Sequence, residues 1–375
     1  MRILQVISSS ATSGAERHVL SLSKRLIERG HQVSVVCPDE GWLPVALGEA
    51  GVAVYPSQMK GRGWARTLGL VLRHSARHRA DVVHTHLTRA AYIGFAAGLI
   101  GRKPVVTSVH IANNDQIYKR LARGRNRLVA VSQYVSGMLH GRGIPERYID
   151  MVYNGTDFID FEPDEAPPVK EEFSIPKERR LVGLVGRVCR EKGHLELIEA
   201  FGRVRREHPD AHIVFVGRVV ETFADELNEA IDRSGLAPHL TMTGVRHDVP
   251  RLLDSFTLTT MPSHVETFGV AAIEAMARGK AVVANRVGGL MEVVRHRQTG
   301  LLVDLRPEAL ADAVSYLLAH DEERERMGRS GRRLVAQRFT VAEMVRRMES
   351  VYAHAQGLAD EMPPIEALEG LAPVL

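Results

Sequence analysis

Short apolar segments alternate with segments of helical periodicity along almost the whole chain. Val33–Cys37 and Leu181–Val185 have no alternating polar positions, which is typical of parallel strands buried on both faces. Between such runs lie amphipathic segments such as Glu16–Arg29, which Gly30 closes. Repeated strand–helix units predict an open, doubly wound α/β sheet, and the pattern occurs twice. The expected strands are Ile3–Ile7, Gln32–Cys37, Val52–Tyr55, Val82–Thr85, Val105–Val109, Leu128–Val131, Met151–Tyr153, Leu181–Val185, Ile213–Val216, Leu240–Thr243, Leu258–Met261, Ala281–Ala284 and Leu301–Val303.

A stretch rich in proline and acidic residues separates the two halves of this pattern. We expect a first domain over residues 1–160, a linker over 161–178 and a second domain over 179–338. An amphipathic helix over 339–356 and a loosely packed tail over 357–375 follow. Ligands of open α/β sheets bind at the carboxyl ends of the strands, so the cleft between the halves is the expected site.

Composition narrows the class of protein. The chain has 375 residues, 45% of them hydrophobic and 25% charged, which excludes a disordered, collagenous or disulfide-dense protein. Cys37 and Cys189 match no metal or redox spacing, which favours a reducing cytoplasm. The N-terminal apolar run is too short for a signal peptide. The longest uncharged apolar stretch, Ala90–Gly101, has 12 residues and is too short to span a bilayer, so any membrane contact is expected to be peripheral.

Charge is divided unevenly between the halves. Residues 1–160 contain 21 Lys/Arg and 11 Asp/Glu, a net charge of +10, whereas the remainder has a net charge of −6. A basic helix with a tryptophan suits an anionic membrane surface, although a solvated helix face explains the same pattern. Nucleic acid is not an expected partner, because no binding module is present and aromatic residues make up only 5% of the chain. The basic residues form two groups: Lys60, Arg62, Arg66, Arg73, Arg77 and Arg79 beside Trp64, and Lys119, Arg120, Arg123, Arg125 and Arg127.

The segment from Glu266 to Glu274 follows a predicted strand and leads into a helix that Gly269 opens. Backbone amides at Phe268, Gly269 and Val270 at such a helix start suit a phosphate group. The two carboxylates suit hydrogen bonds to vicinal hydroxyls. Equally, Glu274 could pair with a neighbouring cation and Glu266 could cap the helix.

Two further loops leave strand ends. Arg187 and Lys192 lie in a glycine-bounded loop after Leu181–Val185 and could neutralise a diphosphate, although a solvated charged loop is the alternative. The loop after the first strand lacks the G-x-G-x-x-G dinucleotide fingerprint, but Gly14 before a helix still offers amides to an anion. A simple capped turn explains Gly14 as well.

His84, His86 and His110 also lie at the ends of expected strands. A zinc site could be drawn from them, but no carboxylate or cysteine lies at ligand spacing, so we expect no metal. A histidine that binds a hydroxylated ligand is the favoured interpretation, with a buried structural role open for His84.

Taken together, these motifs resemble the family 4 retaining glycosyltransferases over residues 1–355. That resemblance implies the GT-B fold, in which two Rossmann-like doubly wound parallel-sheet domains face a central cleft. The order and spacing of the motifs on alternating strand ends are specific, whereas each one alone is weak. The motifs are Ser13-Gly14-Ala-Glu-Arg17-His, Asp81-Val-Val-His84-Thr-His86, Val105-Val-Thr-Ser-Val-His110, Asn154-Gly-Thr-Asp157, Gly186-Arg187 with Glu191-Lys192-Gly193, Glu266-Thr-Phe-Gly with Glu274, and Gly288-Gly289 with Glu292.

The resemblance also implies roles in donor binding and catalysis. Arg187 and Lys192 would hold the donor's diphosphate and stabilise leaving-group charge, which makes a metal or other cofactor unnecessary. Glu266 would grip the transferred sugar, and His110 would lie beside it near the reacting carbon. The configuration at the anomeric carbon would be retained, by front-face attack of the acceptor. The full expected donor set is Gly14, Arg187, Lys192, Glu266, Thr267, Phe268, Gly269, Val270 and Glu274, the last of these on the nucleotide's ribose.

The first domain would bind the acceptor, through Arg17, His86 and Arg89. The family often has Gly-Gly where this chain has Ser13-Gly14, and serine tolerates a positive φ less well, so the phosphate contact of this loop is the least secure. The final helix would cross back onto the first domain.

The expected reaction is transfer of a sugar from a nucleotide-diphosphate sugar to a hydroxyl acceptor. A UDP-sugar is the favoured donor and GDP-mannose the alternative. The acceptor would be a glycan, a lipid-linked glycan or a small anionic molecule in cell-envelope or polysaccharide biosynthesis, at the inner face of the cell membrane. A nucleotide-sugar epimerase of the same fold and a non-catalytic sugar-nucleotide-binding protein are the alternatives.

Overall fold

The computed structural model describes residues 1–359 except 62, 112, 114 and 163–167. The chain divides into two compact units, which are described separately. Unit 1 comprises Met1–Gly155 and the segment that begins at Val341, and unit 2 comprises Thr156–Thr340. The division therefore lies five residues before the end of the expected first domain. Residues 156–160 belong to unit 2, where the amide of Thr156 donates to the carbonyl of Phe339 at 2.8 Å.

Unit 1 contains a seven-stranded sheet in which every pair of neighbouring strands is parallel. The strand order is β3-β2-β1-β4-β5-β6-β7, so the direction of strand addition reverses between β1 and β4. The strands are β1 (Arg2–Ile7), β2 (Gln32–Cys37), β3 (Ala53–Pro56), β4 (Val82–His86), β5 (Val105–Val109), β6 (Arg127–Ala130) and β7 (Ile149–Met151).

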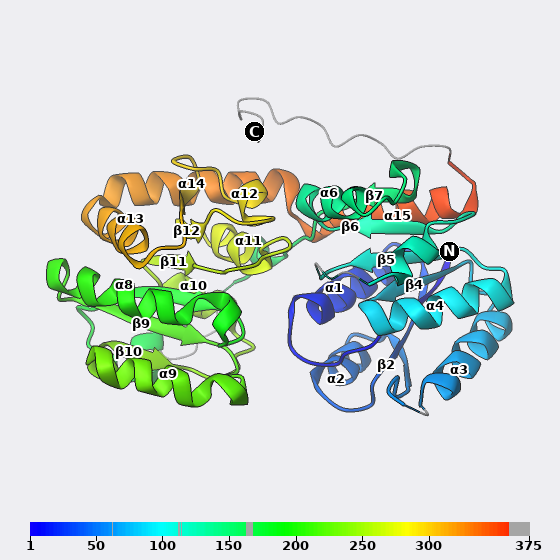
Figure 1. Ribbon diagram of the computed structural model, residues 1–375, viewed down its shortest axis with the longest axis horizontal. Coiled ribbons are helices and arrows are strands. Elements are labelled where there is room, and N and C mark those ends of the chain that lie inside the picture. The colour runs from blue at the N-terminus through cyan, green and yellow to red at the C-terminus, as the bar shows by residue number, and fades with distance from the viewer. Residues whose placement is uncertain (62, 112, 114, 163–167, 360–375) are drawn as a thin grey trace. The chain divides into compact units, whose positions relative to one another are not determined.

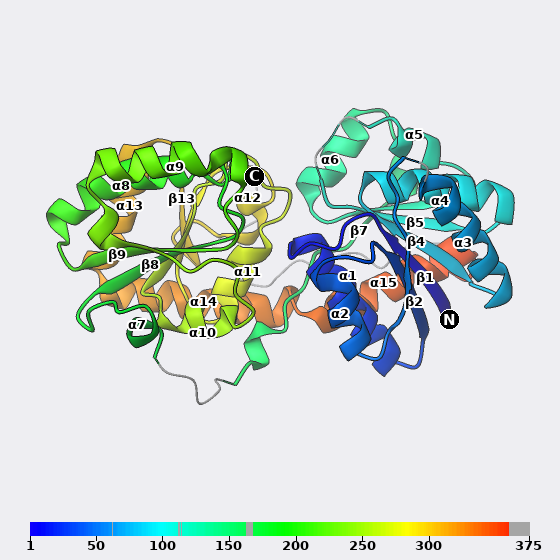
Figure 2. The ribbon, with the colours of Figure 1, turned by 90° about the horizontal axis from the view of Figure 1, so that it is seen from below.

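Helices cover both faces of this sheet (Figure 2). One hydrophobic cluster joins the sheet to the helices numbered 1, 2 and 15, and a second joins its other face to helices 3 and 4. Strands with two buried faces are mostly apolar, which explains their nearly continuous hydrophobic runs. The helices are α1 (Gly14–Glu28), α2 (Trp42–Glu49), α3 (Gly63–Arg77), α4 (Thr88–Gly101), α5 (Ile117–Leu121), α6 (Gln133–Gly141) and α15 (Val341–Gln356), with a 3-10 turn at Glu146–Tyr148.

Unit 2 repeats the same design with six parallel strands in the order β10-β9-β8-β11-β12-β13. Here the order reverses between β8 and β11. The strands are β8 (Arg180–Val185), β9 (Ala211–Val216), β10 (Leu240–Met242), β11 (Leu258–Met261), β12 (Val282–Asn285) and β13 (Gly300–Val303).

The helices of unit 2 also lie on both faces of its sheet (Figure 2). The cluster around Phe201 and Phe215 joins one face of the sheet to the eighth, ninth and thirteenth helices. The helices are α7 (Val169–Glu172), α8 (His194–Glu207), α9 (Glu221–Ser234), α10 (Val249–Ser255), α11 (Val270–Ala277), α12 (Leu290–Val293), α13 (Pro307–Ala319) and α14 (Asp321–Arg338), with 3-10 turns at Phe158–Asp160, Arg190–Lys192 and Ala237–His239.

The chain returns to unit 1 through α15, which packs against α1 (Figure 1). Met344, Met348 and Tyr352 of α15 are buried in the unit 1 core. At its exposed edge, Glu349 accepts hydrogen bonds from Arg29 at 2.7 Å and 2.8 Å. The last helix is thus a structural part of the first sheet's cover.

Part of the expected linker is folded. Val169 of α7 and Ile175 are buried, and Glu172 forms ion pairs with Arg246 at 2.5 Å and with Arg251. Residues 163–167 of this segment, and residues 360–375 of the expected tail, lie outside the described residues. Among the helices that are described, none combines the length and apolar character needed to cross a bilayer.

Candidate functional site

In unit 2, the loops that follow β8 and β11 meet at the point where the strand order reverses. A Cβ atom on Gly193, where φ is +74°, would lie 1.8 Å from the carbonyl oxygen of Pro262. Only glycine allows this approach of the two backbones. The amide of His264 also donates to the carbonyl of Glu191 at 2.9 Å, so the two loops hold each other in place.

An ion pair joins these two loops. Nζ of Lys192 lies 2.6 Å from Oε2 of Glu266, and the side chains are 26% and 17% exposed. Lys192 was expected to bind a diphosphate and Glu266 a sugar, and the structure brings the two together. Arg187 lies exposed at the start of the same loop.

The start of α11 is fixed by close backbone packing. Gly269, with φ +105°, precedes the first helical residue, Val270. The amide of Gly289 donates to the carbonyl of Glu266 at 2.9 Å, and a Cβ on Gly289 would lie 2.4 Å from the Cα of Phe268. The first amides of a helix have no acceptor within the helix and carry partial positive charge, so this fixed turn is suited to an anion.

The remaining residues of this region differ in exposure. Phe268 is 1% exposed and makes an edge contact with Phe339, with the ring centroids 5.7 Å apart, so its side chain belongs to the core. Thr267 and Val270 are partly exposed. Glu274 is 6% exposed on the second turn of α11.

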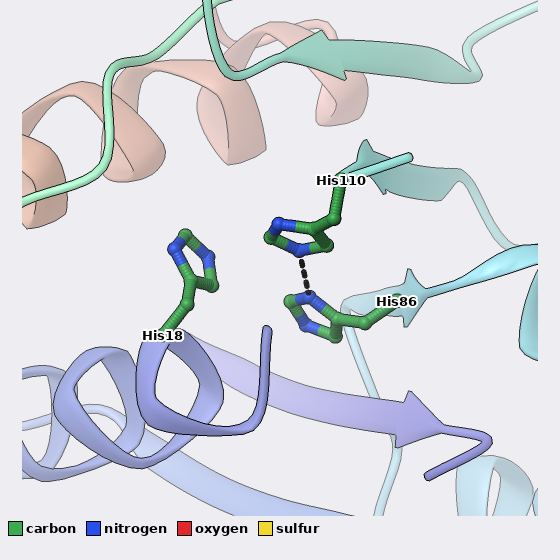
Figure 3. Close-up of side chains that lie close together, drawn as sticks. All are labelled: His18, His86 and His110. Atoms are coloured by element: carbon green, nitrogen blue, oxygen red, sulfur yellow. Dashed lines mark hydrogen bonds between the residues drawn. The ribbon is translucent and has the colours of Figure 1, made fainter. Parts of the chain in front are cut away.

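In unit 1, three histidines from three elements lie together (Figure 3). His18 comes from α1, His86 ends β4 and His110 follows β5. Nδ1 of His86 and Nε2 of His110 are 3.2 Å apart, and the ring of His18 lies 4.9 Å from that of His110 and 5.5 Å from that of His86. One nitrogen from each ring lies within 4.8 Å of the other two.

Amide side chains orient two of these rings. Oδ1 of Asn154 accepts from Nδ1 of His18 at 2.9 Å, and Oε1 of Gln5 accepts from Nε2 of His86 at 3.0 Å. Burial lowers the pKa of His18 to about 4 and holds the pKa values of His86 and His110 well below their usual range, with neighbouring histidines adding to the effect for the latter two. All three imidazoles are therefore neutral at pH 7.

His84 is separate from this cluster in its bonding. Its Nδ1 lies 2.8 Å from the hydroxyl of Tyr352, and its Nε2 lies 2.8 Å from the hydroxyl of Ser108. Both ring nitrogens are used inside the core, where His84 is fully buried. Its place is that of a structural histidine, and it links β4 to α15.

The other expected residues of unit 1 lie near helix starts. Gly14 is exposed and begins α1, Arg17 is partly buried on the same helix, and Arg89 is exposed on the first turn of α4. Ser13 has φ −137°, which serine adopts without strain, so the difference from Gly-Gly places no strained residue in this loop. The hydroxyl of Ser13 donates to the carboxylate of Glu16.

His18 and the two residues that orient the cluster, Gln5 and Asn154, were given no role of their own from the sequence, although His18 and Asn154 stand in the quoted motifs. His18 lies four residues before Leu22 and eight before Leu26, and all three are buried on one face of α1. Helical periodicity could therefore have placed His18 inside. Gln5 and Asn154 carry no such signal, because their contacts join residues 81 and 136 positions apart.

The two basic groups differ from their expected arrangement. Arg66, Arg73 and Arg77 are exposed on α3, and Trp64 is 37% exposed. Arg127 instead forms a buried ion pair with Asp150 at 2.6 Å, so it does not add to the basic surface. Lys60, Arg79, Lys119, Arg120, Arg123 and Arg125 are exposed, and Arg62 lies outside the described residues.

Comparisons with known proteins agree with this arrangement. Residues 12–158 match the family described as Glycosyltransferase Family 4, and residues 166–334 match Glycosyl transferases group 1. The D-inositol 3-phosphate glycosyltransferase of Segniliparus rotundus is 30% identical over 291 residues, which cover 70% of this chain and 64% of that protein. The N-acetyl-alpha-D-glucosaminyl L-malate synthase of Bacillus anthracis is 25% identical over 88% of this chain and 91% of that protein. The crystal structure of Anabaena HepE in complex with UDP and glucose matches with a TM-score of 0.85 at 22% identity, over 94% of this chain and 99% of that one.

Proposed function

The chain belongs to the family 4 glycosyltransferases and has their GT-B fold, and we propose that it takes its sugar from a nucleotide-diphosphate donor with retention of configuration. The observation that carries this proposal is the Lys192–Glu266 ion pair at the strand-order reversal of unit 2. It sets a cation and a carboxylate side by side next to the fixed start of α11.

Donor binding at this pair follows from its charges. A diphosphate brings negative charge that the Lys192 ammonium and the Arg187 guanidinium can share, Lys192 as a point charge and Arg187 through paired hydrogen bonds. Glu266, released from Lys192, can then accept hydrogen bonds from sugar hydroxyls. Amides of Gly269 and Val270 at the helix start add to the anion site. The charge of the leaving nucleotide is thus met by side chains and helix amides, and we propose that no metal is needed there.

The remaining assignments divide between the units. In unit 2, Gly269, Thr267, Phe268 and Val270 form the loop that frames the donor, and Glu274 binds the ribose. In unit 1, His110 acts on the reacting sugar, Gly14 offers its amide to phosphate or acceptor, and the acceptor is held by His86, Arg17 and Arg89. The basic surface of unit 1 supports an anionic acceptor or a lipid-linked glycan held at an anionic membrane.

The donor is proposed to be a UDP-sugar, because HepE of the same fold was crystallised with UDP and glucose. Thermal unfolding of the full chain with UDP, GDP and ADP, each with its common sugars, tests this choice. A ligand at 100 times its Kd stabilises the folded protein by about 2.7 kcal/mol, so the tightest binder gives the largest rise in Tm. A larger rise with GDP-mannose than with any UDP-sugar overturns the choice of base.

Replacement of Lys192 tests the site itself. Lys192→Ala removes a charge that stabilises the leaving diphosphate, and we expect kcat/KM to fall about 10²–10³-fold. Lys177→Ala is the matched control, because Lys177 is 84% exposed and its ammonium forms a surface salt bridge with Glu171 at 3.3 Å. Turnover that is equal in the two variants contradicts the diphosphate assignment.

Two outcomes would favour the alternatives. Incubation with donor and no acceptor distinguishes an epimerase, since an epimerised nucleotide sugar then appears without transfer. Nucleotide-sugar binding with no turnover on any acceptor panel would indicate a non-catalytic binding protein.

The anomeric configuration of the product, read from its proton coupling constant, tests retention.

A further inference from the structure

The three-histidine cluster of unit 1 has the arrangement of ligands that a transition metal requires. We propose that His18, His86 and His110 of unit 1 bind one Zn²⁺ ion, whereas the proposed diphosphate site belongs to unit 2. This proposal goes beyond the transfer reaction, for which we propose that no metal is needed at the leaving group.

The distances between ring nitrogens are close to those of a tetrahedral site. Zinc–nitrogen bonds of about 2.0–2.1 Å place two ligand atoms of a tetrahedron about 3.3 Å apart. Nδ1 of His86 and Nε2 of His110 are already 3.2 Å apart. One nitrogen of each of the three rings lies within 4.8 Å of one nitrogen of the other two, and we propose that rotation of the His18 ring brings its nitrogen to the third corner (Figure 3).

The orienting hydrogen bonds leave the correct nitrogens for a metal. A carbonyl oxygen only accepts, so Asn154 fixes the proton of His18 on Nδ1 and Gln5 fixes the proton of His86 on Nε2. The lone pairs of His18 Nε2 and His86 Nδ1 are therefore the ones available. Metal-binding histidines commonly donate their second nitrogen to such a partner. For His110, a shift of its proton from Nε2 to Nδ1 frees the third lone pair.

His18 Nε2 supplies an independent observation. This nitrogen is buried and has no hydrogen-bond partner among the described residues, and the residue as a whole is 6% exposed. A buried polar atom without a partner is costly, and a bound ion would satisfy it. Neutral imidazole is also the form that binds zinc, and burial keeps all three rings neutral.

The ligand set indicates which ion binds. Imidazole nitrogens suit zinc and copper, whereas magnesium and calcium prefer oxygen. Three histidines leave a fourth tetrahedral position for water or another ligand, and His110 is the least buried of the three. Because the proposed function assigns His110 to the reacting sugar and His86 to the acceptor, zinc on these rings should inhibit transfer; this consequence rests on that proposed function.

The test measures binding on the full chain without reference to activity. Metal-free protein is titrated with Zn²⁺ against a chromogenic chelator, and with Co²⁺, whose visible spectrum reports tetrahedral nitrogen coordination. We expect one ion per chain. His18→Gln, which removes a ligand, should weaken Zn²⁺ binding about 100-fold. Asn154→Ala, which removes the partner that orients His18, should weaken it about 10-fold.

His78→Gln is the matched control. His74 of α3 and His78, which follows the end of that helix, stack with ring centroids 4.2 Å apart and form a competing histidine pair outside the cluster. We expect His78→Gln to bind Zn²⁺ as the unaltered chain does. Equal binding by His18→Gln, or loss of binding in His78→Gln alone, overturns the proposal. Circular dichroism and Tm establish that each variant is folded.

Activity then separates the two proposals. Stoichiometric zinc that inhibits the unaltered chain but not His18→Gln supports both the metal site and the role of His110. Stoichiometric zinc with undiminished transfer supports the metal site and overturns the role of His110. Absence of stoichiometric binding overturns the metal site whatever the activity.

Discussion

Single glycines decide how closely the site loops of unit 2 approach each other. Gly193 meets the carbonyl of Pro262, and Gly289 meets the backbone of Thr267 and Phe268. In each case the opposing atoms are backbone, which cannot rotate away as a side chain can. These contacts set the positions of Lys192 and Glu266 before any substrate binds, and their positions matter because catalytic electrostatics depend on fixed charges.

Gly289→Ala should therefore disturb the site. Its Cβ would lie 2.4 Å from the Cα of Phe268, and we expect a loss of about 1–3 kcal/mol in the free energy of unfolding together with weaker nucleotide binding. Gly202→Ala is the control, since Gly202 lies within α8 and its Cβ would have no atom within 4 Å. That variant should gain about 0.5–1 kcal/mol. Urea unfolding measures both, and a neutral Gly289→Ala would show that the loop relaxes freely.

Buried histidines in unit 2 make its stability depend on pH. Burial lowers the pKa values of His194 and His212 to about 4, so the folded unit holds both rings neutral where the unfolded chain would protonate them below about 6.5. The unfolded state then binds more protons, and stability falls as pH falls from about 6.5 to 4, by up to about 1.4 kcal/mol per pH unit for each group. Above about pH 6.5 both rings are neutral in the folded and in the unfolded chain, so they add no pH dependence to the free energy of unfolding.

Urea midpoints between pH 7.5 and pH 4.5 measure this dependence. His194→Gln should lower the slope below pH 6.5, because it removes one of the histidines whose pKa is lower in the folded chain than in the unfolded chain. A free energy of unfolding that is constant across this range would contradict the neutral, buried state of these rings.

At the scale of elements, the sequence predicts the strands well. All thirteen expected strands occur in the described part of the chain, and Gln32–Cys37, Val105–Val109 and Leu258–Met261 have the expected bounds. Continuous apolar runs between helical segments leave little ambiguity, because both faces of most of these strands are buried. β7 is the exception: expected at Met151–Tyr153, it lies at Ile149–Met151.

The displacement of β7 has a physical cause. Val152 and Tyr153 are apolar and buried, but the ladder with β6 is formed two residues earlier, at Ile149–Met151, where the side chain of Asp150 forms an ion pair with Arg127. The charged residues of a buried ion pair are polar in the sequence, so the hydrophobic pattern does not predict the strand that carries them.

The candidate site is limited in a similar way. Residue types and strand ends predict Lys192 and Glu266 separately, but they do not predict a contact between residues 74 positions apart.

The bond between α15 and β4 gives a prediction for an element. Tyr352→Phe removes the hydroxyl that binds Nδ1 of buried His84 at 2.8 Å. The unpaired nitrogen should cost about 1–3 kcal/mol in the free energy of unfolding. Tyr316→Phe, whose residue is 40% exposed on α13, is the control and should change little. Equal stability of the two variants would mean that this hydrogen bond does not anchor the helix.

At the scale of the whole molecule, charge separates the two halves of the chain. The net charge of residues 1–160 is +10, and Arg66, Arg73 and Arg77 carry part of that charge on the exposed face of α3. Arg127 shows why a count of charges is insufficient, since it is neutralised inside the core. Only exposed cations can bring an anionic acceptor or membrane to this surface.

Binding to vesicles of phosphatidylserine and phosphatidylcholine tests this surface. Replacement of Arg66, Arg73 and Arg77 by Gln should weaken binding about 100-fold at low salt, at about 1 kcal/mol for each cation near the membrane. Replacement of Arg203, Arg329 and Arg333 of unit 2 by Gln changes the net charge equally and should have little effect. Binding that resists 0.5 M salt, or that both sets reduce alike, would contradict an electrostatic surface on α3.

The return of the chain to unit 1 through α15 determines the order in which the units can be completed during synthesis. The ribosome produces residues 1–155 first, but the face of their sheet that α15 covers lacks Met344, Met348 and Tyr352 until all of unit 2 has been made. Unit 2 is continuous in sequence and has every residue of its core earlier. Domains usually fold in order from the N-terminus. In this protein the second unit can therefore fold first. Until α15 has been synthesised, the nascent first unit exposes an apolar face of the kind that chaperones bind.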